Sequence, residues 1–130
     1  MNYGYFDDKN KEYVITRPDT PSPWMNYLGN GKFSGMISNN AGGLVFDSDP
    51  GSHRITMDRP GHYLYLRDME SGEYWSASWQ PVMRDMQEYE CRHGMGYTTI
   101  KGKYADISSR VTYFIPDGKN YEVWKAAVRN

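Results

Sequence analysis

The pair Cys91 and His93 is the first feature of this sequence that suggests reactive chemistry. On a strand, two residues that lie two positions apart share a face, and a thiolate beside an imidazole is the beginning of a nucleophilic site. Such a site also needs a third group that orients the imidazole, and the sequence identifies none. We therefore interpret Cys91 as a packed thiol beside a hydrogen-bonded imidazole.

Metal ligands and catalytic carboxylates are weaker candidates. The three histidines, His53, His62 and His93, match no zinc or iron spacing, so no metal site is predicted. A glycosidase-like mechanism needs a carboxyl group that is held protonated near a second acid or a nucleophile. Asp47 and Asp49 lie in a loop rich in glycine and proline, as does Asp58, and we keep the three as candidates.

Aromatic side chains offer a second kind of chemistry. Tyr74, Trp75 and Trp79 lie close together in the sequence, and on a strand the two tryptophans would point the same way. One hypothesis is that their rings stack on a carbohydrate. The other, which we favour, is that they fill the core of a protein that is poor in leucine.

The glycine pair Gly42 and Gly43 follows a polar stretch, residues 38–41 (SNNA). It predicts a tight turn with exposed backbone N–H groups that could meet a phosphate or a hydroxyl group. The pair matches neither a Walker loop nor a dinucleotide-binding fingerprint.

The composition limits the kind of domain that can carry these residues. The chain has 130 residues, which fits one domain, and 15 Lys+Arg against 16 Asp+Glu give a net charge of -1. A nucleic-acid partner is not expected, because the cations form no stripe or excess. A membrane span is not expected either, since no apolar run approaches the ~20 residues that one requires. A single cysteine and the lack of an export signal lead us to expect a cytoplasmic protein.

The fold class expected is all-β, an antiparallel β-sandwich with little helix. Leucine and alanine are rare whereas tyrosine occurs 12 times, and glycine and proline divide the chain into pieces of strand length. Residues 107–115 show the clearest alternation, residues 116–119 predict a turn, and residues 16–24 predict a surface connector because they contain three prolines. The strands expected span residues 12–16, 33–38, 43–46, 54–57, 62–67, 89–93, 97–101, 106–115 and 121–128.

Nine ordered segments of the chain resemble a known enzyme family. They are residues 3–8 (YGYFDD), 12–16 (EYVIT), 23–29 (PWMNYLG), 37–43 (ISNNAGG), 58–68 (DRPGHYLYLRD), 74–82 (YWSASWQPV), 89–97 (YECRHGMGY), 113–116 (YFIP) and 122–125 (EVWK). In this order they resemble the N-terminal region of family 94 of the glycoside hydrolases, which includes cellobiose, chitobiose and laminaribiose phosphorylases. Residues 58–63 are closer to chitobiose-type members and residues 89–94 to cellobiose-type members, so the linkage stays open.

The resemblance implies an architecture and a reaction. Members have an N-terminal β-sandwich, a helical linker, a catalytic (α/α)6 barrel and a small C-terminal β domain. They cleave a β-linked, cellobiose-like disaccharide with inorganic phosphate and invert the anomeric centre, which gives an α-sugar 1-phosphate. Phosphate is a co-substrate, and no cofactor or metal is needed. An aspartic acid in the barrel protonates the leaving oxygen.

The resemblance also implies a role for this chain. We expect residues 1–130 to be the N-terminal β-sandwich region of a larger phosphorylase, since the strand pattern runs up to the last residues and no part of the barrel is present. This region is expected to carry no catalytic residue, to be inactive alone and to help form a homodimer. Candidates to line the sugar site are Gly42, Gly43, Asp47, Trp75 and Trp79. The alternatives are a free-standing carbohydrate-binding β-sandwich module and a purely structural dimerisation domain.

Overall fold

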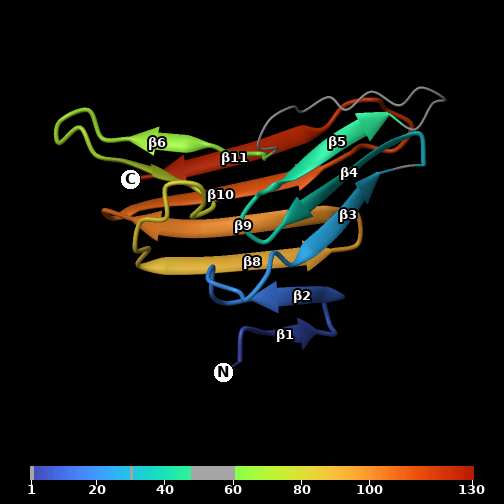
Figure 1. Ribbon diagram of the computed structural model, residues 1–130, viewed down its shortest axis with the longest axis horizontal. Helices are drawn as coiled ribbons and strands as arrows, with labels where there is room; N and C mark the ends of the chain where they lie inside the picture. Colours follow the sequence, from blue (N-terminus) through green and yellow to red (C-terminus); the bar gives the residue numbers. More distant parts are fainter. Residues whose placement is uncertain (1, 30, 48–60) are drawn as a thin grey trace.

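The computed structural model describes residues 2–29, 31–47 and 61–130 (Figure 1). Short strands connected by turns make up this part of the chain, and it contains no helix that could span a membrane. The strands are β1 (Gly4–Asp7), β2 (Glu12–Ile15), β3 (Met25–Gly29), β4 (Phe33–Ser38), β5 (Gly43–Asp47), β6 (Tyr65–Arg67), β7 (Tyr74–Ser76), β8 (Glu88–Gly94), β9 (Tyr97–Tyr104), β10 (Ile107–Phe114) and β11 (Val123–Arg129).

The strands form two facing sheets and a small hairpin. The large sheet has the order β1-β2-β8-β9-β10-β11, and the small sheet has the order β3-β4-β5. β6 pairs with β7, and all pairs are antiparallel. In Figure 1 the small sheet crosses one face of the large sheet, which we call the inner face. The opposite face of the large sheet is called the outer face. The expected all-β sandwich is confirmed.

The core lies between the two sheets. β10 shows how the sequence builds it, because Ser109, Val111 and Tyr113 are buried while Ser108 and Arg110 are exposed. The alternation predicted for residues 107–115 is therefore confirmed. On β2, β8 and β9 of the large sheet, side chains of the inner face are buried as well. The small sheet contributes the buried side chains of its facing side. The core cluster contains Ile15, Leu28, Phe33, Ile37, Ala41, Val45, Ala77, Cys91, Ile100, Val111, Tyr113 and Ile115.

The connections agree with the sequence in two places. Residues 16–24 contain no strand and are mostly exposed, as expected for the connector. At the turn, the N–H group of Lys119 donates to the carbonyl of Pro116 at 3.2 Å, and Gly118 has a φ of +67°. The hairpin between β10 and β11 is thus confirmed, although β11 begins at Val123 rather than directly after the turn.

The structure contains three strands that the sequence did not predict, β1, β3 and β7, and one strand, β6, that is shorter than predicted. β1 and β3 lie at sheet edges, where much of each strand is exposed and the alternation of hydrophobic residues is weak. β7 has only three residues. The strand expected at residues 62–67 is limited to β6, because residues 62–64 bond to the turn after β4 and to the segment after β7 instead. The strand expected at residues 54–57 lies outside the described residues.

Candidate functional site

In the turn that precedes Gly43, backbone N–H groups donate hydrogen bonds to Ser38 within the same turn. The hydroxyl of Ser38 accepts from the N–H groups of Asn40 at 3.2 Å and of Gly42 at 2.9 Å, and the N–H group of Ala41 donates to the Ser38 carbonyl at 3.0 Å. The expectation of exposed N–H groups ready for a phosphate or hydroxyl is therefore wrong for residues 40–42. Sequence reasoning missed the competing acceptor, the side chain of Ser38.

The two asparagines of this turn hold the connector against the sandwich. Asn40 Nδ2 donates to the carbonyl of Pro18 at 2.7 Å, and Asn39 Oδ1 accepts from the Trp24 N–H group at 3.0 Å. The hydroxyl of Tyr89 donates to the Asn39 carbonyl. Asn39 and Asn40 are both buried. Their amides satisfy backbone groups that the proline-rich connector leaves without ladder partners, which is a structural role.

Gly43 and Asp47 stand at the two ends of β5. Gly43 has a φ of +150°, and a Cβ atom there would collide with the backbone carbonyl of Met36. The position therefore requires glycine for packing reasons. Gly42 forms an isolated bridge with Gly61, so this end of β5 is covered by the segment that starts at residue 61. Asp47 pairs with Phe33 at the far end of the strand.

The two tryptophans differ in their surroundings. Trp75 lies in β7 and is 2% exposed, and its ring centroid is 5.0 Å from that of Tyr104. The interpretation of Trp75 as a core residue is confirmed, and its ring has no free face for a sugar. Trp79 lies in the turn after β7 with a φ of +76° and is half-buried. The expectation that both side chains point the same way along a strand is wrong, because β7 ends at Ser76.

The five predicted site residues lie on two separate segments, the β5 strand with the turn before it and the β7 strand with the turn after it. The short segment of residues 61–64 separates them, since Gly61 bridges to Gly42 at one end while the Leu64 carbonyl accepts from the Ala77 N–H group at 2.9 Å at the other. Gly42 and Gly43 therefore lie at one end of this segment and the Trp75–Trp79 stretch at the other.

Cys91 and His93 share the inner face of β8, as predicted, and Sγ lies 3.9 Å from both imidazole nitrogens. Burial raises the pKa of the Cys91 thiol, with a further contribution from the charge of Glu90, so the thiol stays protonated. His93 Nε2 donates to the Trp24 carbonyl at 2.9 Å, which leaves Nδ1 to accept from the Thr98 hydroxyl at 2.9 Å. Burial lowers the pKa of His93, in keeping with a neutral ring. The interpretation as a packed thiol beside a hydrogen-bonded imidazole is confirmed.

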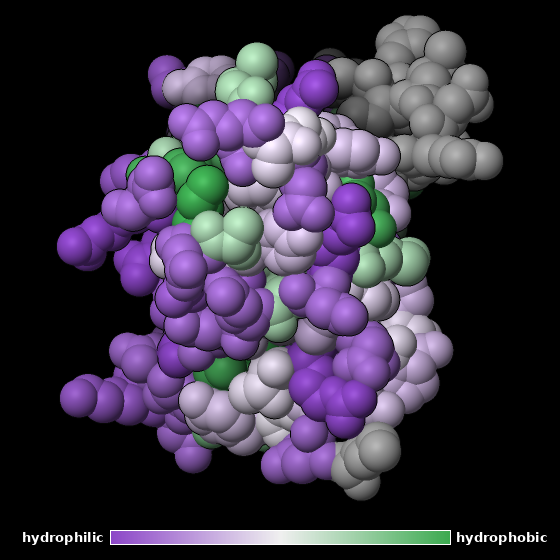
Figure 2. Space-filling view, turned by 90° about the vertical axis from the view of Figure 1, so that its left-hand side faces the viewer, coloured by the Kyte–Doolittle hydropathy of each residue, from purple (hydrophilic) through white to green (hydrophobic). Residues whose placement is uncertain are grey.

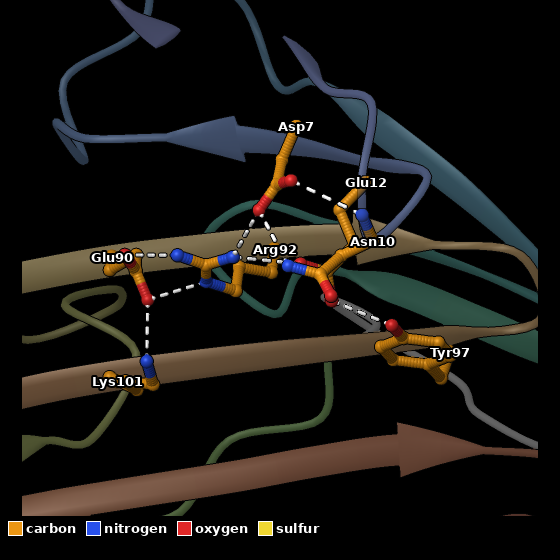
Figure 3. Close-up of polar contacts among 7 residues, drawn as sticks. All are labelled: Asp7, Asn10, Glu12, Glu90, Arg92, Tyr97 and Lys101. Carbon is orange, nitrogen blue, oxygen red and sulfur yellow. Dashed lines mark hydrogen bonds and ion pairs between the residues drawn. The ribbon is translucent and has the colours of Figure 1, made fainter. Parts of the chain in front are cut away.

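An ion-pair cluster on the outer face was missed by sequence reasoning (Figure 3). Arg92 lies at its centre, with Nε 2.8 Å from Glu90 Oε1 and Nη1 2.8 Å from Glu12 Oε2. Hydrogen bonds from Arg92, together with Lys101 at 2.6 Å, lower the pKa of Glu90 to about 2. The hydroxyl of Tyr97 donates to Glu12 Oε1 at 2.6 Å. The spacing of Glu90 and Arg92 on one strand is a local signal for their pair, but only the strand register brings Glu12 and Lys101 to it, so the whole cluster could not be predicted from the sequence.

The second feature missed is an aromatic groove, a hollow of about 1070 Å³ beside the edge of β3. Phe6 is 77% exposed, Tyr27 is 72% exposed and Met95 is 83% exposed. Asn26 and His93 also line the groove, but their polar groups are already bonded to neighbours. The groove thus offers mainly apolar contact. Its apolar lining consists of Phe6, Tyr13, Trp24, Met25, Tyr27 and Met95.

These arrangements limit the chemistry of the described part of the chain. No group of three or more His, Cys, Asp or Glu side chains among residues 2–29, 31–47 and 61–130 could hold a metal ion. The thiol is buried and protonated, and hydrogen bonds from Arg92 and Lys101 hold the pKa of Glu90 at about 2, so this carboxyl group is ionised. The arrangement provides surfaces for contact and a rigid scaffold.

Comparisons with known proteins agree with this geometry. The chain is 50% identical over its whole length to N,N'-diacetylchitobiose phosphorylase of Vibrio proteolyticus and 49% identical to that of Vibrio furnissii, and it covers 17% of each. It is 38% identical over 98% of its length to 3-O-beta-D-glucopyranosyl-beta-D-glucuronide phosphorylase of Paenibacillus borealis, of which it covers 16%. The chain therefore spans about one sixth of these relatives. Residues 11–130 match the family described as glycosyl hydrolase 94, supersandwich domain. The all-β sandwich and this match together show that the chain belongs to the supersandwich domains of glycosyl hydrolase family 94.

Proposed function

We propose that the chain is the N-terminal part of an inverting phosphorylase that cleaves a β-linked disaccharide with inorganic phosphate to an α-sugar 1-phosphate and a free sugar. The observation that carries this proposal is the 50% identity over the whole chain to N,N'-diacetylchitobiose phosphorylase. The glucosyl glucuronide relative is also a phosphorylase but has another substrate, so the reaction class is better supported than the linkage. Phosphate is the co-substrate, and the reaction uses no cofactor.

Within that enzyme, the sandwich would serve as a scaffold that is inactive alone. The general acid and the phosphate-binding residues would come from an (α/α)6 barrel in another part of the polypeptide. The surroundings of Cys91, His93 and Glu90 support a scaffold role for this domain. The thiol is buried, the imidazole is hydrogen-bonded through both nitrogens and the carboxylate is paired with Arg92, so none of them is available as an acid or a nucleophile. The intact enzyme would be a cytoplasmic homodimer.

The sandwich would also contribute to the sugar site. Gly42, Gly43, Asp47 and Trp79 remain the proposed lining residues, with the buried Trp75 supporting the turn that carries Trp79. The half-buried Trp79 is held in a defined turn by the bond between the Met83 N–H group and its carbonyl at 2.7 Å, so its ring would be positioned before a sugar arrives.

An assay of two proteins tests this proposal. The full-length gene product, incubated with inorganic phosphate and either N,N'-diacetylchitobiose or cellobiose, should release a sugar 1-phosphate, whereas the 130-residue chain should release none. In the full-length enzyme, Trp79→Ala should raise KM for the disaccharide, while Tyr5→Ala, an exposed control, should not. Turnover by the 130-residue chain, or no phosphorolysis of any β-linked disaccharide by the full-length enzyme, would contradict the proposal.

The aromatic groove favours a second candidate function, a carbohydrate-binding module. Exposed rings such as Phe6 and Tyr27 are suited to stack on the C–H faces of a sugar. Titration of the 130-residue chain with cellobiose would test it. Saturable binding that is lost in Phe6→Ala supports a module that uses the groove, and loss in Trp79→Ala supports one that uses the turn. Failure to bind leaves the scaffold function as the better account.

A further inference from the structure

His62 is a polar residue in the interior of the sandwich. Hydrophilic side chains cover most of the end of the molecule that carries the β6–β7 hairpin (Figure 2), whereas His62 is 1% exposed. Its Nε2 atom lies 3.2 Å from Oε1 of Glu122, whose side chain is 8% exposed. Among the described residues, neither of these two atoms has an aligned hydrogen-bond partner. An apolar side chain would fill the place at a lower free-energy cost, so packing alone does not explain a histidine at position 62.

His62 contacts three separate elements. Its N–H group donates to the Ala41 carbonyl at 2.7 Å, in the turn before β5, and Nδ1 lies 3.4 Å from the same oxygen. Its carbonyl accepts from the hydroxyl of Tyr113, on β10, at 3.0 Å. Glu122 directly precedes β11, and its Oε2 accepts from Nε1 of Trp124 at 2.7 Å. His62 therefore connects the turn before β5 with the large sheet.

The imidazole of His62 also packs against two aromatic rings. Its centroid lies 5.9 Å from that of Tyr113 and 5.5 Å from that of Trp124, and the centroids of these two rings are 5.7 Å apart. Edge-on and tilted rings at such distances stabilise a contact beyond the area that they bury. The two rings therefore restrict rotation of the imidazole and keep Nε2 beside Glu122.

The short segment that contains His62 lies between the two groups of proposed sugar-site residues. Gly61 bridges to Gly42 at one end, and the Leu64 carbonyl accepts from the Ala77 N–H group at 2.9 Å at the other. Leu64 also packs against the core, but apolar packing has no preferred direction. The hydrogen bonds and the ion pair of His62 are directional, so they determine where this segment lies on the large sheet.

We propose that His62 is a positioning residue, which fixes the Gly42–Gly43 turn relative to the turn that carries Trp79. Its anchors in the large sheet are the side chains of Glu122 and Tyr113. A disaccharide that contacts both turns requires a fixed spacing between them, so a loosened segment weakens substrate binding rather than the chemical step. The inference rests on the proposed sugar site, but the anchors of His62 can be tested without it.

Two substitutions, which we call the anchor variants, weaken the anchors with little change of shape. Glu122→Gln removes the charge beside Nε2, and Tyr113→Phe removes the hydroxyl that donates to the His62 carbonyl. The matched controls make the same chemical changes on the outer face of the large sheet. They are Glu90→Gln on β8, which removes the partner of a guanidinium, and Tyr97→Phe on β9, which removes a hydroxyl that donates to a carboxylate.

Amide hydrogen exchange of the 130-residue chain tests the anchors by themselves. The N–H groups of His62 and Ala77 report on the two ends of the segment, because the first donates to the turn before β5 and the second to the segment itself. Both should exchange about tenfold faster or more in each anchor variant, since local opening becomes easier. In the two controls they should keep the rates of the original chain. Unchanged rates in both anchor variants would overturn the proposal.

Steady-state kinetics of the full-length gene product test the consequence for the sugar site. Each anchor variant should raise KM for the disaccharide by about tenfold, leave KM for phosphate unchanged and alter kcat by less than about threefold, whereas the controls should alter none of these. If the original enzyme is active and the anchor variants keep its KM, this inference is overturned and the proposed function stands. If the original enzyme phosphorolyses no β-linked disaccharide, the proposed function falls and the positioning role falls with it, whatever the exchange rates show.

Discussion

Arg92 holds the carboxylate of Glu90 through two parallel hydrogen bonds, Nε to Oε1 at 2.8 Å and Nη2 to Oε2 at 3.0 Å (Figure 3). The two residues lie two positions apart on β8 and therefore share the outer face. Arg92 Nη1 also reaches Glu12 on β2 at 2.8 Å, so one guanidinium connects the β1–β2 hairpin with the rest of the sheet. A bidentate pair of this kind is stronger and more specific in geometry than a single ion pair.

Protonation of Glu90 is therefore expected to destabilise the domain. Its pKa is about 2 in the folded chain against an ordinary value of 4.5, so its contribution to the free energy of unfolding is complete above about pH 5 and is lost as the pH falls toward 2. Glu90→Gln should lower the free energy of unfolding at pH 7 by roughly 1–3 kcal/mol. Urea unfolding at a series of pH values measures this, with Glu88→Gln on the same strand as the control. Identical pH profiles for Glu90→Gln and the original chain would contradict the prediction.

The hydroxyl of Thr98 is expected to keep His93 neutral in one tautomer. It donates to Nδ1, so the proton lies on Nε2, where the Trp24 carbonyl accepts it. The folded pKa of His93 lies below its ordinary value, so the contribution to stability is present at neutral pH and is lost as the pH falls through the ordinary value and below it. Thr98→Val should cost roughly 1–3 kcal/mol, because Nδ1 of the buried ring is left without a partner. Nitrogen NMR shifts of His93 report its tautomer and its pKa. A proton found on Nδ1 in the original chain would refute the assignment of the tautomer.

Cys91 is expected to be chemically silent in the folded protein. Its thiol is fully buried and its pKa is raised by burial, so the reactive thiolate is scarce. Labelling by a thiol reagent at pH 8 should be slower by roughly two orders of magnitude or more than in urea, because it requires local opening. The same chain in urea provides the control rate. Rapid labelling under native conditions would show that the β8 region opens easily.

Gly43 is expected to tolerate no side chain. It combines a φ of +150° with a collision between an added Cβ and the Met36 carbonyl. Gly43→Ala should therefore destabilise the domain by roughly 2–4 kcal/mol. Gly96→Ala is the matched control, because Gly96 has a φ of +84° with open space around it and should cost only about 1 kcal/mol. Thermal unfolding of both variants separates the collision from the backbone strain, and equal losses would rule the collision out.

The sequence predicted those parts of the fold that depend on residues close together in the chain. Alternation predicted β10, and proline and glycine predicted the connector and the turn before β11. The orientation of Trp79 was wrong because the chain turns directly after β7, where the Trp79 N–H group donates to the Ser76 carbonyl at 3.1 Å, and the spacing of the two tryptophans does not indicate this turn. The Arg92 cluster could not be predicted because Glu12 and Arg92 come together only through the pairing of β2 with β8. The aromatic groove likewise forms only when the edge of β3 is placed beside β1 and β2.

The order of strands in the large sheet has a consequence for folding kinetics. β8 to β11 follow one another as successive hairpins, so each pair can close early by joining neighbouring parts of the chain. The β1–β2 hairpin can join only when Ile15 meets Cys91, which requires closure of a loop containing the entire small sheet. The rate-limiting event is thus expected to be the docking of the N-terminal hairpin on a preformed meander, and mutations in β2 should slow refolding less than equally costly mutations in β9.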